Sequence, residues 1–190
     1  VDRFSPASLE ALLGCPLEWA LRYRAGARAG GHALPPLYLL NGSLGHRLVE
    51  LLHGDGAFEL EEADLRHQAE TRLETLFRRE GAVLLRPGMG FERGQLERQL
   101  VGAVLELSRL LRSAGLRIAG VEQTVEASWQ GGKLEGRLDL LVATRDGRYA
   151  IIDMKGGMSI YRDLLRSGLA LQLAAYAFAH GGEADPAAWP

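Results

Sequence analysis

The strongest constraint on the fold is a predicted β-hairpin near the C-terminal end of the chain, formed by Lys133–Thr144 and Arg148–Lys155. Both segments are rich in Leu, Ile, Val and Tyr, and Arg145-Asp146-Gly147 separates them. A two-residue loop would send Asp139 and Asp153 to opposite faces of the hairpin. A three-residue loop with a left-handed glycine pairs the two aspartates instead, and we expect this register because it brings the carboxylates together.

Two adjacent carboxylates repel each other unless a cation lies between them. Side chains alternate along a strand, so Lys155 is expected on the same face as Asp153. Carboxylate oxygens suit Mg²⁺ or Mn²⁺, and such a cation can polarise a phosphodiester and supply a hydroxide nucleophile at neutral pH. Lys155 would then hold the attacking water or stabilise charge in the transition state. Taken alone, Asp-x-Lys also fits a solvated ion pair, because so short a pattern recurs by chance.

Two predicted helices carry further candidate residues. Gln172 and Tyr176 are four residues apart, and therefore on one face, in a helix predicted over Leu164–His180. Upstream, Asn41 is a capping-type residue that opens a second helical pattern, which contains His46. A histidine on a helix is more often a surface or core residue than a ligand, so His46 is a candidate only in the company of the acidic pair.

Together these segments resemble the RecB-like nuclease domains of the PD-(D/E)xK superfamily, which occur in bacterial helicase-nucleases and in CRISPR adaptation nucleases. The N-terminal segment Phe4–Tyr23 resembles the opening helices of that family, with their Ser, Leu and Cys-Pro pattern. The family's histidine, Gly-x-x-Asp, Asp-x-Lys and Gln-x-x-x-Tyr motifs resemble Gly42–His46, Gly136–Asp139, Asp153–Lys155 and Gln172–Tyr176. No single element is specific, but five in this order are.

The resemblance implies an α/β fold of the restriction-endonuclease type, with a mixed sheet flanked by helices and a helical N-terminal lobe. It implies one nuclease domain over residues 1–190, mainly helical over 1–115, with the catalytic sheet and the Gln/Tyr helix over 116–190.

The resemblance also implies roles for individual residues. His46, Asp139 and Asp153 would bind the metal ion, with the Met154 backbone carbonyl as a fourth ligand. Lys155 would be the catalytic lysine, while Gln172 and Tyr176 would complete the catalytic set by positioning Lys155 or the DNA backbone.

The function implied is that of a Mg²⁺- or Mn²⁺-dependent deoxyribonuclease acting on DNA ends or single strands, in repair, recombination or end processing. A helicase domain or subunit is the partner expected from the family. The alternative is a nuclease-like module that binds DNA or a helicase without doing chemistry. The presence of all the expected polar residues favours activity, because an inert module would be free to replace Asp153 or Lys155.

The chain departs from several members of the family at its single cysteine, Cys15. Those members carry a four-cysteine iron-sulfur cluster, with one ligand in the Cys-Pro motif and three near the C-terminus. One cysteine cannot assemble such a cluster, so none is expected from this chain. Either Cys15 is a relic or an ordinary packing residue beside Pro16, as in cluster-free relatives, or the chain was cut before its remaining ligands. The ending at Pro190 leaves truncation and a disordered tail open.

Composition is consistent with this interpretation. A chain of 190 residues can bury the core of one compact domain. The net charge of −2 means that DNA binding would depend on a local patch, such as Arg22, Arg24 and Arg28, or Arg162 and Arg166. Neither a membrane span nor a signal peptide is recognisable, and the expected setting is the reducing cytoplasm, which suits a single thiol.

Overall fold

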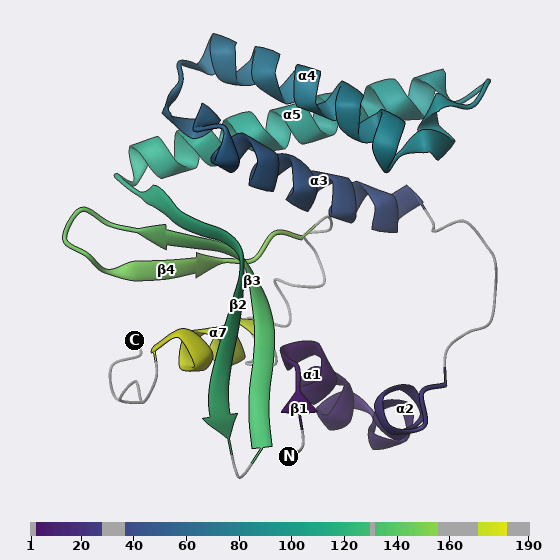
Figure 1. Ribbon diagram of the computed structural model, residues 1–190, viewed down its shortest axis with the longest axis vertical. Coiled ribbons are helices and arrows are strands. Elements are labelled where there is room, and N and C mark those ends of the chain that lie inside the picture. Colours follow the sequence, from purple (N-terminus) through teal and green to yellow (C-terminus); the bar gives the residue numbers. More distant parts are fainter. Residues whose placement is uncertain (1–2, 28–36, 130–131, 156–170, 182–190) are drawn as a thin grey trace. The chain divides into compact units, whose positions relative to one another are not determined.

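The computed structural model describes residues 3–27, 37–129, 132–155 and 171–181 (Figure 1). The chain divides into two compact units. Unit 1 takes in the described parts of residues 1–34, 123–139 and 151–190, and unit 2 those of residues 35–122 and 140–150. The predicted helix start at 164–170, three of the candidate arginines (Arg28, Arg162 and Arg166) and the chain end at 185–190 lie outside the described residues.

The strands form a mixed sheet of the predicted α/β class. Its order is β1-β3-β2, with β4 also paired to β3, from β1 (Arg3–Phe4), β2 (Arg117–Trp129), β3 (Gly132–Ala143) and β4 (Tyr149–Ile152). Strand β1 runs parallel to β3, with Arg3 opposite Lys133 and Phe4 opposite Leu134.

The turn between β3 and β4 has the predicted three-residue geometry. Gly147 is left-handed, with φ of 85°, and the backbone N–H of Thr144 donates to the carbonyl of Arg148 at 2.9 Å. The prediction that β4 extends to Lys155 was wrong, because the strand ends at Ile152. Beyond that point the backbone N–H of Met154 donates to the Asp139 side chain at 2.6 Å, so a carboxylate takes the place of a strand carbonyl.

Unit 2 contains a layer of three helices, α3 (Leu37–Gly54), α4 (Glu62–Arg79) and α5 (Gly90–Ser113), which lie side by side in Figure 1. Short 3-10 turns, η2 (Ala57–Glu59) and η3 (Ala82–Leu85), connect them. Apolar residues at helical spacing form the core, with these examples on the three helices: Leu44, Leu48, Leu52, Leu65, Leu73, Leu96 and Leu105. The predicted opening of α3 at Asn41 was wrong, because the apolar stripe continues back through the buried Leu40 and the helix begins at Leu37.

Unit 1 contains α1 (Pro6–Gly14), α2 (Pro16–Trp19), a π-helical turn η1 (Ala20–Arg24) and α7 (Leu171–Gly181), which packs against α1. Local signals mark the start of α1: the Ser5 hydroxyl accepts the N–H of Ser8 at 3.1 Å, and Pro6 occupies the first turn. The indole N–H of Trp19 donates to the Ser8 hydroxyl at 2.8 Å, which ties α2 to α1. The two N-terminal helices are thus grouped with α7, while the single nuclease domain stays a prediction. No helix in the described parts of the chain is both long and apolar enough to cross a membrane.

Candidate metal and catalytic site

Asp139 and Asp153 form the acidic part of the candidate site in unit 1. Asp139 lies on β3 and is buried, with 7 % of its surface exposed, while Asp153 follows the end of β4. The bond from the Met154 N–H to Asp139 Oδ2 fixes the chain directly after Asp153. Burial raises the pKa of Asp153, and the nearby Asp139 carboxylate acts in the same direction, although Lys155 opposes it. Asp139 therefore lies close enough to Asp153 to act on the pKa of its carboxyl group.

One oxygen of Asp153 has no protein donor. Asp153 Oδ2 pairs with Lys155 Nζ at 3.0 Å, but Oδ1 is buried and accepts no hydrogen bond among the described residues. A buried carboxylate oxygen without a donor is costly, since its charge has lost water without gaining a partner. Hard anionic oxygens of this kind fit a divalent cation such as Mg²⁺ or Mn²⁺.

Lys155 is held from two sides within unit 1. Its ammonium lies 3.0 Å from Asp153 Oδ2 and donates to Gln172 Oε1 at 3.2 Å. The amide nitrogen of Gln172 donates in turn to the Tyr176 hydroxyl at 3.0 Å. Two of the residues predicted to position Lys155 therefore form a continuous hydrogen-bonded chain that ends on it. Burial raises the pKa of Tyr176, with Asp139 and Asp153 adding to the effect, so its phenol stays protonated at neutral pH.

The ring of Tyr176 explains why residue 136, three positions before Asp139 on β3, is a glycine. A Cβ at this position would lie 2.5 Å from Tyr176 Cε1, 3.1 Å from Cδ1 of the same ring and 3.3 Å from Pro6 Cδ. Carbon atoms in proteins pack at about 3.5 to 4.0 Å, so a side chain here is excluded by the tyrosine ring. The first residue of the Gly-x-x-Asp pattern thus makes room for the last residue of the Gln-x-x-x-Tyr pattern.

His46 lies on α3 in unit 2, where its Nδ1 is 2.7 Å from Glu122 Oε1. Glu122 belongs to β2 and is mostly buried, with 13 % of its side chain exposed. A carboxylate on one ring nitrogen fixes the orientation of a histidine and leaves the other nitrogen for a metal ion, which is the usual arrangement around metal-binding histidines.

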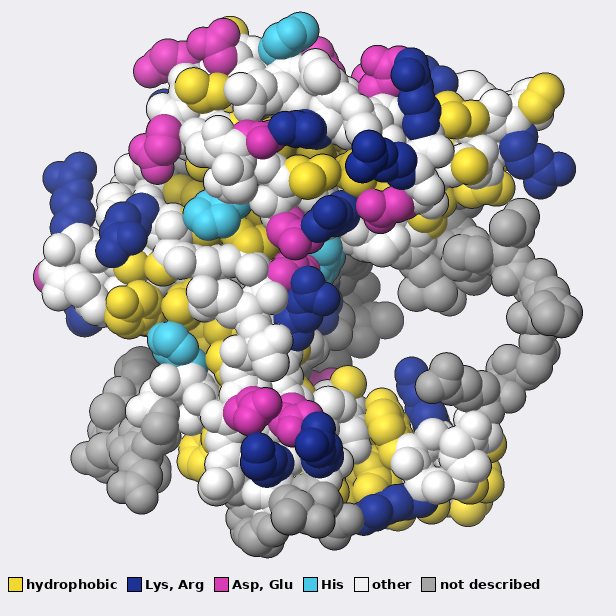
Figure 2. Space-filling view, in the orientation of Figure 1, with side chains coloured by type: hydrophobic (Ala, Val, Ile, Leu, Met, Phe, Trp, Pro, Cys, Tyr) yellow, Lys and Arg dark blue, Asp and Glu magenta, His cyan; other side chains and the backbone are white. Residues whose placement is uncertain are grey.

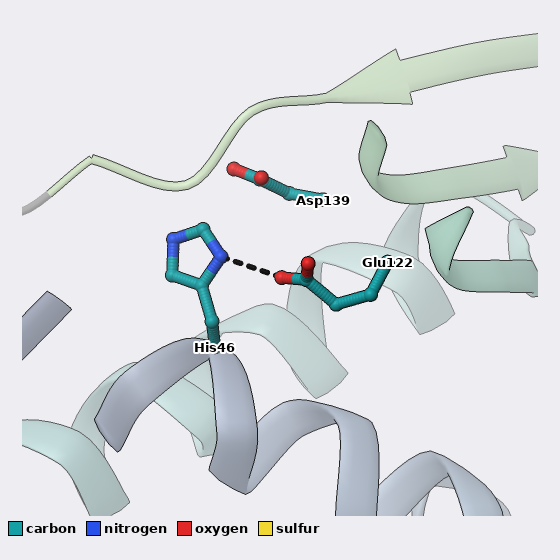
Figure 3. Close-up of side chains that lie close together, drawn as sticks. All are labelled: His46, Glu122 and Asp139. Atoms are coloured by element: carbon teal, nitrogen blue, oxygen red, sulfur yellow. Dashed lines mark hydrogen bonds and ion pairs between the residues drawn. The ribbon is translucent and has the colours of Figure 1, made fainter. Parts of the chain in front are cut away.

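Figure 3 draws the His46–Glu122 pair of unit 2 together with the Asp139 side chain of unit 1. An imidazole nitrogen and carboxylate oxygens are both ligand types for divalent metal ions. Of the three side chains predicted as ligands, His46 lies in unit 2, and Asp139 and Asp153 lie in unit 1.

Glu122 was missed in the sequence because its signal is weak. It alternates with apolar residues on β2 in the same way as Glu126, and such a pattern normally marks the solvent face of a strand. Its partner His46 is 76 residues away. Only the observation that an acidic residue falls one strand upstream of Asp139 could have drawn attention to it.

Two other predictions concern the N-terminal helices. The interpretation of Cys15 as a buried packing residue was wrong, because this cysteine is exposed at the extended junction between α1 and α2. Of the candidate basic patches, Arg22 and Arg24 are exposed on η1. Their guanidinium groups lie over the rings of Tyr23 and Trp19, at 5.4 and 5.2 Å from the ring centres.

The chain was compared with known protein families. The family model described as the PD-(D/E)XK nuclease superfamily matches residues 3–188, which include every candidate site residue. No curated protein matches the chain. The family match supports hydrolysis of phosphodiester bonds, and it agrees with a mixed sheet flanked by helices of the restriction-endonuclease type.

Proposed function

The chain belongs to the PD-(D/E)XK nuclease superfamily, and we propose that it is a metal-dependent deoxyribonuclease of the RecB-like type. One observation carries the proposal. The Lys155 ammonium is held between the Asp153 carboxylate and the Gln172 amide, directly after a chain segment that is bonded to Asp139. The Lys155 ammonium, held beside the Asp153 carboxylate and close to Asp139, is an arrangement suited to a divalent metal ion and a phosphodiester.

The proposed ligands are His46, Asp139, Asp153 and the backbone carbonyl of Met154. Glu122 would accept the N–H of His46 Nδ1 and so direct Nε2 toward the cation. When bound, Mg²⁺ or Mn²⁺ would polarise the scissile phosphodiester and lower the pKa of the attacking water. The buried Asp153 Oδ1, which has no donor among the residues that the structure describes, supports a ligand role for this residue.

Lys155 would act on the reacting atoms themselves. With Asp153 and Gln172 fixing its ammonium, little reorganisation is needed when negative charge develops on the phosphoryl oxygens. Tyr176 would act through Gln172, because its hydroxyl accepts the amide N–H and so fixes which side of the amide faces Lys155.

DNA is the proposed substrate, either as single strands or at duplex ends. Basic and acidic side chains are interspersed over the face drawn in Figure 2, and no broad basic surface is visible on it. Engagement of the phosphate backbone would therefore depend on local arginines such as Arg22 and Arg24 and on the bound cation. The RecB-like assignment, a role in repair or end processing and a helicase partner rest on the five motifs and their order.

Digestion of end-labelled DNA tests the proposal. Single-stranded, linear duplex and closed circular substrates are incubated with Mg²⁺, with Mn²⁺ or with EDTA. Cleavage is expected with the metals and not with EDTA, and the ratio of linear to circular substrate consumed measures the need for ends.

The chain's only two lysines, Lys133 and Lys155, provide a matched control. Lys155→Ala is expected to reduce turnover by roughly 10²- to 10⁴-fold while metal binding is kept. Lys133→Ala, at an exposed position on β3 next to Glu126, is expected to cleave at the parental rate. Equal rates for the parent and Lys155→Ala would contradict the role given to Lys155. DNA binding without cleavage under all conditions would favour the inert binding module instead.

A further inference from the structure

Glu10 on α1 makes a long-range hydrogen bond to the residue that holds Lys155. Its Oε1 accepts the backbone N–H of Gln172 at 2.9 Å, across a sequence separation of 162 residues. The side chain of the same glutamine accepts from Lys155 at 3.2 Å and donates to Tyr176 at 3.0 Å. All four residues belong to unit 1.

The bond joins a backbone N–H of α7 to a side chain on α1. A carboxylate is a strong acceptor for a backbone N–H, because its negative charge strengthens the hydrogen bond. Helices α1 and α7 are packed together, so Glu10 supplies this acceptor from a rigid neighbour.

The consequence is that Glu10 fixes the backbone from which the Gln172 side chain extends. The amide of Gln172 must keep its oxygen toward Lys155 and its nitrogen toward Tyr176. A rotation of α7 at Gln172 would move both contacts, whereas a carboxylate bound to this particular N–H opposes it.

We propose that Glu10 is a positioning residue for the nuclease reaction, acting through Gln172 on the Lys155 ammonium. The inference rests on the proposed function and adds to it a residue of the N-terminal helix that does not touch the metal ligands. Glu10→Ala removes the acceptor, Glu10→Gln keeps a carbonyl oxygen in its place, and Glu18→Ala is the control at an exposed glutamate on α2.

Amine labelling tests the inference without relying on cleavage. The protein is treated briefly with an acetylating reagent, and the modification of Lys155 relative to Lys133 is measured by mass spectrometry in the same molecule. Loss of the amide contact exposes the Lys155 ammonium, whose side chain is 29 % exposed in the structure, so the labelling ratio is expected to rise several-fold in Glu10→Ala and in Gln172→Ala. Glu10→Gln and Glu18→Ala are expected to keep the parental ratio.

An unchanged ratio in Glu10→Ala, or in Gln172→Ala, would overturn the proposal, because Lys155 would then not depend on the Glu10–Gln172 contact. If Glu10→Ala does not fold, the comparison is made with Glu10→Asp, whose shorter side chain keeps the charge but withdraws the carboxylate. A raised ratio in the aspartate variant supports the proposal and a parental ratio contradicts it.

Kinetics of DNA cleavage provide the second arm. Glu10→Ala is expected to lower kcat by roughly 10- to 100-fold with little change in KM, because positioning is lost while substrate binding is kept. In a Gln172→Ala background the same change is expected to have little further effect. Additive losses would contradict the proposal. If the parent cleaves no DNA with any metal, the proposed function fails, and the labelling arm still decides whether Glu10 orders Lys155.

Discussion

Substitution of Gly136 by alanine tests the packing that supports the site. The added Cβ would lie 2.5 Å from Tyr176 Cε1, against about 3.5 to 4.0 Å for a normal carbon contact, so the ring must move by about 1 Å. Tyr176 is only 6 % exposed, so its ring has little room to move. Pro6 Cδ lies 3.3 Å from the same Cβ position and restricts movement of the added methyl group on another side. Overpacking of this kind costs about 1 to 3 kcal/mol, which corresponds to a fall of about 2 to 12 °C in Tm for a chain of this length.

The same displacement is expected to lower the rate of DNA cleavage as well as the melting temperature. The Tyr176 hydroxyl accepts from Gln172, whose carbonyl oxygen accepts from Lys155, so a shift of the ring moves the lysine. A misplacement of about 1 Å can reduce turnover by roughly 10²-fold.

The assay pairs thermal melting without metal with single-turnover cleavage of labelled DNA. Gly102→Ala on α5 is the control, since nothing lies within 4 Å of its Cβ position and alanine favours a helix by up to about 1 kcal/mol. Its Tm should rise slightly, with activity unchanged. A Gly136→Ala protein that melts and cleaves like the parent would refute the argument, because Tyr176 would then not be held against β3.

The remaining predictions concern three side chains. Asp153→Asn should stabilise the metal-free protein at neutral pH. Folding raises the pKa of this carboxyl group, so its ionised form destabilises the native state, and this destabilisation becomes smaller as the pH falls. Melting curves of both proteins at pH 5 and pH 7 measure the difference. The same variant should lose the stabilisation by Mg²⁺, about 2.7 kcal/mol for a parent protein at 100 times its Kd, and an equal response of both proteins would exclude Asp153 as a ligand. Glu122→Gln should weaken metal binding by roughly 10- to 100-fold through His46, as measured by calorimetry, and an unchanged affinity would contradict the pairing role. Cys15→Ser should change stability by less than about 0.5 kcal/mol in denaturant unfolding, because the thiol is exposed; a large loss would indicate a buried role.

Local signals in the sequence predicted much of the fold. Ser5, Pro6 and Gly14 mark the two ends of α1, and Gly147 identifies the three-residue turn, because each has a conformational preference that acts over a few residues. The same reasoning failed at Asn41, where a capping preference was outweighed by an apolar stripe that continues back to the buried Leu40, in a helix that begins at Leu37. It failed again at the end of β4, where the Asp139 carboxylate accepts the N–H of Met154 in place of a strand carbonyl.

The candidate site was harder to predict, since its contacts join distant segments. Spacing placed Gln172 and Tyr176 on one helix face, and their hydrogen bond follows directly from that. The acceptors supplied by Glu10 and Glu122 could not be found in this way, because neither residue has a local pattern that distinguishes it from a surface glutamate.

Glu122 illustrates what the sequence conceals. Among the described residues it is the one non-glycine residue with a positive φ, 51°, within a strand. A side chain in this region of backbone space costs about 1 to 3 kcal/mol and persists only where its surroundings compensate. Here the compensation includes the 2.7 Å contact with His46 Nδ1, in which a mostly buried carboxylate is matched to a ring nitrogen. A glycine would adopt the same backbone without strain but could not orient His46, so the strain is the cost of directing a carboxylate at the histidine proposed to bind the metal ion.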